Sequence, residues 1–153
     1  MTWSYSRVAS FDDCPYKWFL SYLYRDENGR SLKKKSGFFA EFGSYMHKIL
    51  QMYLSGLLEK ERLSTYYVAH FKENVFSKAP NSKIYMNYFQ QGFHYLDDFS
   101  FPSRTIIGVE EKVDFMFAGR KFTGFVDLIS KNGKLIVTDH KSRTLKPRSK
   151  RSK

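Results

Sequence analysis

Near its C-terminal end the sequence places a carboxylate and an ammonium group, Asp139 and Lys141, two residues apart. The apolar residues Leu135 and Val137 precede them at the same spacing. This alternation predicts a β-strand from Leu135 to His140, in which these four side chains share one face and His140 points to the other. Charged groups at the end of an apolar row are costly to bury unless something compensates them. A bound cation would be one such compensation.

A second carboxylate, Asp127, lies in the preceding strand-like segment, from Lys121 to Ile129. Antiparallel pairing of the two strands could bring Asp127 close to Asp139. Two converging carboxylates that leave room for water and phosphate are what magnesium requires of a protein. The alternative is that Asp139 and Lys141 form an exposed ion pair and Asp127 is a surface acid. The apolar neighbours of Asp127 are unusual for a solvated acid, but spacing alone does not decide. These neighbours are Phe125, Val126, Leu128 and Ile129.

Helical periodicity dominates the first hundred residues. Two short helices are predicted between Ser4 and Tyr24, the second of which begins at Pro15, a residue suited to the first turn of a helix. A polar loop from Asp26 to Lys35 follows, and the strongest helical pattern then runs from Gly37 to Leu58. The apolar stripe of that helix consists of Tyr45, Met46, Ile49, Leu50, Tyr53, Leu54 and Leu57.

Two more amphipathic helices, Leu63 to Phe76 and Ile84 to Phe99, precede a change of pattern after Pro102. Alternating residues then indicate three strands, joined by short hairpin turns. The expected fold is a mixed α/β fold in α+β order, with N-terminal helices followed by a three-stranded antiparallel meander. The strands are Ile106 to Phe117, Lys121 to Ile129 and Leu135 to His140, and the turns are Ala118-Gly119-Arg120 and Lys131-Asn132-Gly133.

The balance of charge favours a polyanionic partner such as nucleic acid, although ribosomal and membrane-surface proteins share it. Lysine and arginine number 26 against 15 acids, which gives a formal charge of +11. Seven of these cations lie between Lys141 and Lys153, which leaves +4 (11 less 7) on the rest of the chain. The length of 153 residues suits one domain, expected over residues 1–145 and followed by a basic tail over residues 146–153.

Four motifs in order along the chain resemble those of the PD-(D/E)XK nuclease superfamily. The segment from Gly124 to Ile129 carries Gly-x-x-Asp, and the segment from Val137 to Lys141 carries Asp-x-Lys. Upstream, Gly43 to His47 reads Gly-x-x-x-His, and the N-terminal segment with Ser6, Phe11 and residues 14–20 is similar to the one that opens these domains. The match is closest to the RecB-like branch, which includes CRISPR-associated exonucleases. The resemblance implies a restriction-endonuclease-like core.

Carried over to this sequence, the resemblance implies that Asp127 and Asp139 ligate Mg²⁺ or Mn²⁺. His47 and the main-chain carbonyl of His140 would be further ligands, and Lys141 would orient or activate water. The cation would lower the pKa of water and screen the phosphate, while the ammonium group would stabilise charge that accumulates at phosphorus.

Two of these assignments have alternatives in the sequence. A histidine on a helix is more often structural than a ligand, so the role of His47 depends on its Gly-x-x-x-His context. Family members also often carry an acid on the first strand, where the sequence offers both Glu110 and Glu111. Alternation puts Glu110 on the polar face with Lys112, so Glu110 is the candidate, but a solvated acid is as consistent with the pattern for either residue.

The chain also departs from the family pattern. Some relatives hold an iron–sulfur cluster with a cysteine at the place of Cys14 and three more near the C-terminus, which are absent here, so no cluster is expected and Cys14 is predicted to be a small buried residue. The helix with Gln-x-x-x-Tyr and the strand that follow Asp-x-Lys are also missing, which predicts a C-terminally truncated domain. Gln91 to Tyr95 has that spacing but lies upstream, in a helix interpreted as packing.

The leading hypothesis from the sequence is a metal-dependent, exonuclease-like deoxyribonuclease of recombination, repair, phage or mobile-element DNA processing. The competing hypothesis is an inactive, truncated nuclease remnant that only binds DNA. DNA is the expected partner, with a helicase or recombination protein as a further candidate and no membrane. A single cysteine, no export signal and no apolar run of membrane-spanning length favour a cytoplasmic, prokaryotic or phage-encoded protein.

Overall fold

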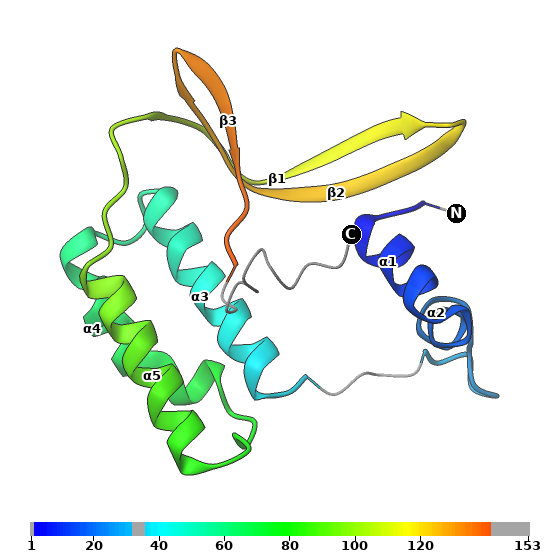
Figure 1. Ribbon diagram of the computed structural model, residues 1–153, viewed down its shortest axis with the longest axis horizontal. Coiled ribbons are helices and arrows are strands. Elements are labelled where there is room, and N and C mark those ends of the chain that lie inside the picture. The colour runs from blue at the N-terminus through cyan, green and yellow to red at the C-terminus, as the bar shows by residue number, and fades with distance from the viewer. Residues whose placement is uncertain (1, 32–35, 142–153) are drawn as a thin grey trace, which may run out of the picture.

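The computed structural model describes residues 2–31 and 36–141, with helices first and strands last (Figure 1). The strands form one antiparallel sheet in the order β1-β2-β3, so the α+β fold expected from the sequence is confirmed. No helix in these two ranges is long and apolar enough to cross a membrane. The elements are α1 (Tyr5–Asp13), α2 (Pro15–Tyr22), α3 (Phe38–Leu54), the 3₁₀ turn η1 (Lys60–Arg62), α4 (Leu63–Asn74), α5 (Ser82–Asp97), β1 (Thr105–Phe117), β2 (Arg120–Asn132) and β3 (Lys134–Thr138).

The two N-terminal helices lie below the far end of the β1–β2 hairpin (Figure 1). Trp3 attaches them to the sheet through an isolated parallel bridge to Phe122, and its ring stacks on that of Trp18 with centroids 5.8 Å apart. Cys14 caps α2, since its Sγ accepts a hydrogen bond from the main-chain N–H of Lys17. The expectation of a buried cysteine is therefore wrong: Cys14 is half-buried because it occupies the N-cap ahead of Pro15.

Helix α3 supplies most of the buried stripe predicted for it. Its residues Tyr45, Ile49 and Leu50 are at most 3% exposed, and Ile49 is fully buried. The helix ends at Leu54, earlier than the pattern suggests, because Gly56 takes a left-handed φ of 73° and its N–H bonds the carbonyl of Tyr53. Leu57 therefore leaves the stripe and is 75% exposed.

Helices α3, α4 and α5 pack into one aromatic core. Tyr45 of α3 stacks on Tyr67 of α4 and donates a hydrogen bond to the Tyr67 carbonyl. Burial raises the pKa of both phenols well above the ordinary value. On α5, Gly92 allows close approach, because a Cβ there would lie 2.4 Å from the Tyr67 hydroxyl oxygen and 3.2 Å from the Phe42 ring. The core thus fixes α5 and α3 side by side (Figure 1).

The sheet is a meander built from two tight hairpins. Ala118 and Gly119 both have positive φ, 47° and 69°, as a two-residue hairpin turn whose twist matches the strands requires. Gly133, with φ 68°, forms the second turn between Asn132 and Lys134. Both hairpins predicted from the sequence are confirmed.

The last strand is shorter than expected. The β2–β3 ladder ends with the pair Leu128↔Thr138, so Asp139 and His140 lie beyond the strand. The expected strand from Leu135 to His140 is therefore wrong at its end. The reason is a competing hydrogen bond: the main-chain N–H of His140 donates to the Asp127 carboxylate at 2.6 Å.

A buried carboxylate joins the start of α3 to the segment that connects α4 and α5. Glu41 is 6% exposed, and it accepts hydrogen bonds from the Ser36 hydroxyl and from both the N–H and the hydroxyl of Ser77. Burial alone would raise the pKa of Glu41, but these hydrogen bonds outweigh it and hold the pKa below its ordinary value.

We expect Glu41→Gln to destabilise the protein at neutral pH, because an amide cannot accept all of these donors. A carboxyl whose pKa is lowered by folding contributes stability that is present above its unfolded pKa and lost as pH falls through its folded pKa. The difference between wild type and Glu41→Gln should therefore shrink below about pH 4.5. Urea unfolding across this range tests it, with Glu59→Gln as a control, since Glu59 is exposed and makes no side-chain capping bond. Equal midpoints at pH 7 would contradict the role of Glu41.

Candidate metal centre

Three side chains from three elements converge where α3 meets the sheet. His47 of α3, Glu110 of β1 and Asp127 of β2 each offer a ligand atom, and these atoms all lie within 4.8 Å of one another. All three residues are half-buried. Two of them, His47 and Asp127, were predicted as metal ligands from the sequence, and Glu110 was the candidate among the first-strand acids.

The backbone of β1 explains why Glu110 and not Glu111 reaches the cluster. The flanking pairs Val109↔Leu128 and Glu111↔Val126 put Glu110 at the register position opposite Asp127, but the ladder has no pair there. Glu110 instead has a left-handed φ of 54°, a conformation that costs of order 1 kcal/mol or more for a residue with a side chain.

Because of the left-handed φ at Glu110, the side chain of Glu111 lies back over the preceding part of β1. A Cβ at Gly108 would lie 2.2 Å from Cγ of Glu111, so Glu111 folds over the glycine. Glu111 is exposed and is not part of the cluster. Strand alternation did not decide which of the two acids reaches the site, and in the structure it is Glu110.

Asp127 is the best-anchored member of the cluster, with a side chain 15% exposed. Its Oδ2 accepts the His140 N–H at 2.6 Å. The same oxygen lies 3.6 Å from Nδ1 of His47, which is too long for a hydrogen bond. His47 and Asp127 thus face each other with a gap between their ligand atoms.

Asp139 and Lys141 do not join this group in the described structure. Their side chains are 61% and 52% exposed, and Lys141 Nζ lies 2.7 Å from Asp139 Oδ1. The ion pair that the sequence allowed as an alternative is therefore present. Extending the β2–β3 register by one residue would place Asp139 opposite Asp127, but β3 ends at Thr138.

His140 lies against the cluster with its ring half-buried. The centroid of its ring is 6.2 Å from that of His47, edge to face, and its Nε2 is buried without a hydrogen-bond partner among the described residues. Burial lowers the pKa of His140, partly opposed by the carboxylate of Asp127. Burial therefore favours the neutral form of the ring.

The donor set fits a divalent cation. Metal–ligand distances of roughly 2.0–2.2 Å separate two ligands of an octahedral ion by about 3 Å when adjacent and about 4.3 Å when opposite. The 4.8 Å limit for His47, Glu110 and Asp127 is close to that range. Two carboxylates suit both Mg²⁺ and Mn²⁺, and an imidazole ligand favours Mn²⁺ over Mg²⁺.

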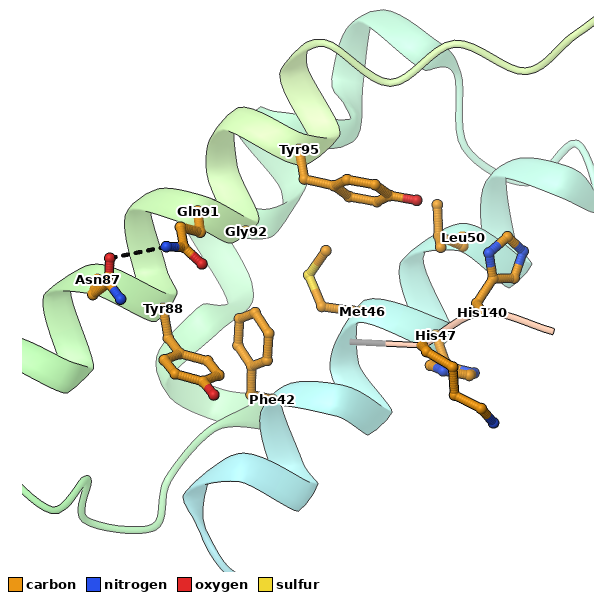
Figure 2. A pocket seen from close by; sticks show the side chains of 11 residues that line it. Phe42, Met46, His47, Leu50, Asn87, Tyr88, Gln91, Gly92, Tyr95 and His140 are labelled. Atoms are coloured by element: carbon orange, nitrogen blue, oxygen red, sulfur yellow. Dashed lines mark hydrogen bonds between the residues drawn. The ribbon is translucent and has the colours of Figure 1, made fainter. Parts of the chain in front are cut away.

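A cavity of about 400 Å³ opens beside the cluster, between α3 and α5 (Figure 2). Gln91 and Tyr95 line it and are exposed, whereas other residues of α5 pack in the core, as the sequence predicts. Sequence reasoning missed Asn87 as a lining residue. The spacing of Asn87, Gln91 and Tyr95 by four residues is the signal that puts them on one face of a helix. The lining residues are Phe42, Met46, His47, Leu50, Asn87, Tyr88, Gln91, Gly92, Tyr95, His140 and Lys141.

A histidine and two carboxylates at the junction of a helix and a sheet are typical of metal-dependent hydrolases. The family model of the PD-(D/E)XK nuclease superfamily matches residues 2–153. The chain therefore belongs to the PD-(D/E)XK nuclease superfamily, which confirms the family indicated by the sequence motifs. Membership indicates a nuclease that uses divalent metal and takes DNA as its substrate. No curated protein and no solved structure matches the chain.

We expect Glu110→Gln to abolish metal binding, whereas Glu111→Gln leaves it intact. A ligand present at about 100 times its Kd adds about 2.7 kcal/mol to the free energy of unfolding. Manganese should therefore raise the Tm of wild type and Glu111→Gln but not of Glu110→Gln. Thermal unfolding with and without MnCl₂ measures this, and calorimetric titration gives the Kd. A similar manganese shift in both variants would show that Glu110 is no ligand.

Proposed function

We propose that this chain is a Mg²⁺- or Mn²⁺-dependent deoxyribonuclease with exonuclease-like action, from the RecB-like branch of its superfamily. The observation that carries the proposal is the convergence of His47, Glu110 and Asp127 within 4.8 Å. These residues come from three separate elements, so their meeting is a property of the fold. Recombination, repair and phage or mobile-element DNA processing are the settings proposed for it, with a helicase or recombination protein as a candidate partner.

In this proposal Asp127, Glu110 and His47 hold the cation. When bound, the cation supplies positive charge that neutralises the carboxylates, lowers the pKa of water and screens the phosphate. The His140 N–H fixes one oxygen of Asp127 at 2.6 Å and leaves the other free to ligate. The same bond holds the backbone at His140 beside the cluster, and the main-chain carbonyl of His140, in the next peptide unit, is proposed as a further ligand.

Lys141 is the proposed catalytic cation. It lines the cavity that also contains His47 and His140, which supports a role for it next to the proposed metal centre. There it would hydrogen-bond the attacking water and the phosphate oxygens that gain charge. Asp139 is proposed as an additional ligand, since an extension of the β2–β3 register by one residue would place it opposite Asp127. In the structure its exposed side chain is bonded to Lys141.

One observation favours the alternative of an inactive remnant that binds DNA. Asp139 lies outside the cluster and neutralises Lys141, the residue proposed to act on the phosphate. An assay of the chain itself distinguishes the two hypotheses.

We expect the purified chain to degrade end-labelled linear DNA with Mg²⁺ or Mn²⁺ and to spare covalently closed circular DNA, because an exonuclease requires an end. Manganese should support cleavage at lower concentration than magnesium, because one ligand is an imidazole. Asp127→Asn should reduce the rate by about 100-fold or more, since even partners of metal ligands cost 10- to 100-fold. Gel analysis of the products with time measures both effects.

Asp114→Asn is the matched control, because Asp114 is an acid of β1 that pairs with Lys112 away from the cluster. Lys141→Met and Asp139→Ala test the two remaining proposed residues in the same assay. DNA binding without metal-dependent cleavage would favour the remnant. Cleavage that is equally fast in Asp127→Asn would reject the proposed centre.

A further inference from the structure

The cavity beside the metal centre has two chemically different ends. Asn87 and Gln91 of α5 lie at one end, and His47 and His140 lie at the other (Figure 2). Lys141 also lines it. Apolar side chains of Phe42, Met46 and Leu50, all buried on α3, lie between the ends. The cavity thus joins an amide-lined end to the end where the metal and the phosphate are proposed to meet.

The amide end offers a paired donor and acceptor. Gln91 Nε2 donates to Asn87 Oδ1 at 3.0 Å, which leaves the Gln91 carbonyl oxygen and the Asn87 amide N–H groups for a ligand. If both amides were turned over, the same pair would still present one N–H group and one carbonyl. A side-by-side donor and acceptor of this kind matches the hydrogen-bonding edge of a nucleobase.

Aromatic rings flank the route between the ends. Tyr88 packs edge to face on Phe42, with ring centroids 5.0 Å apart, and Tyr95 extends across the cavity with its hydroxyl directed towards Leu50 (Figure 2). Tyr95 is 46% exposed, so part of its ring is available for contact. Nucleic-acid-binding proteins use such rings to stack unpaired bases.

The size of the cavity limits its occupant. About 400 Å³ is near the lower end for small-molecule sites, which suits a single nucleotide. A duplex keeps its bases stacked and paired, and a base would have to be flipped out to enter.

We propose that this cavity is a base-binding subsite for single-stranded DNA. It takes one unstacked nucleobase against Asn87, Gln91 and Tyr95 and directs the adjoining phosphate towards Lys141 and the metal centre. The inference rests on the proposed nuclease function and specifies its substrate as an unpaired strand. Asn87, Gln91 and Tyr95 are then specificity residues that touch the base and take no part in the chemistry.

The test is binding of a fluorescent single-stranded oligonucleotide to the full chain in EDTA, where no cleavage occurs. We expect Asn87→Leu/Gln91→Leu to bind roughly 5- to 10-fold more weakly than wild type, the loss of about one net hydrogen bond. Gln90→Leu is the matched control, because Gln90 is an exposed amide on the same helix that does not line the cavity, and it should stay within about twofold of wild type. The same oligonucleotide annealed to its complement should not distinguish the variants.

Replacing each base of the oligonucleotide in turn by an abasic site identifies the base that enters. At one position the loss should match that of the double variant, and the two losses should not add, because both remove the same contact. Binding by Asn87→Leu/Gln91→Leu equal to that of Gln90→Leu, or no effect of any abasic site, overturns the subsite.

The outcomes separate this inference from the proposed function. Metal-dependent cleavage by wild type, together with binding that neither the double variant nor any abasic site weakens, supports the nuclease and rejects the subsite. Base-dependent binding by a chain that never cleaves with Mg²⁺ or Mn²⁺ supports the subsite and rejects the nuclease.

Discussion

The structure around the site depends on three carboxylates that the strand register would place in one row. Val109↔Leu128 and Glu111↔Val126 bracket Glu110 opposite Asp127, and the next β2–β3 pair after Leu128↔Thr138 would be Asp127↔Asp139. Like charges directly opposite on neighbouring strands repel. The ladder is interrupted on both sides of Asp127: β1 turns to positive φ at Glu110, and β3 ends before Asp139. The central acid is left with two gaps beside it.

Partners other than strands fill these gaps. The main-chain N–H of His140 donates a hydrogen bond to Asp127 and not to a strand partner. On the other side, His47 of α3 lies 3.6 Å from the same carboxylate oxygen. The position of α3 depends in turn on the helical core, where Gly92 lets α5 approach Phe42 and Tyr67. The same close packing that places His47 over the sheet also forms one wall of the cavity on α5. Core packing and site geometry are therefore not separable at this helix.

Sequence patterns predicted the elements, because these follow from local periodicity and turn chemistry. Alternation located all three strands, and the positive φ values of Ala118, Gly119 and Gly133 agree with hairpins expected from residue type. The family resemblance predicted His47 and Asp127 as ligands of one metal, and the structure brings them close together with Glu110. The boundaries failed where one non-local bond decided them, as at His140, whose N–H prefers a carboxylate to a strand partner.

The remaining differences have the same physical origin. Alternation assumes extended backbone, so it could not show that Glu110 adopts φ 54° and that Glu111 folds over Gly108. It also could not reveal the cavity, because Asn87 and Gln91 belong to α5 and Lys141 follows β3, and only the tertiary packing of α5 on α3 brings them together. A polar face on a helix is usually a solvated face. The polar face of α5 differs because the half-buried cluster of His47, Glu110 and Asp127 lies next to it. That cluster in turn depends on the interruption of the strand ladder on both sides of Asp127.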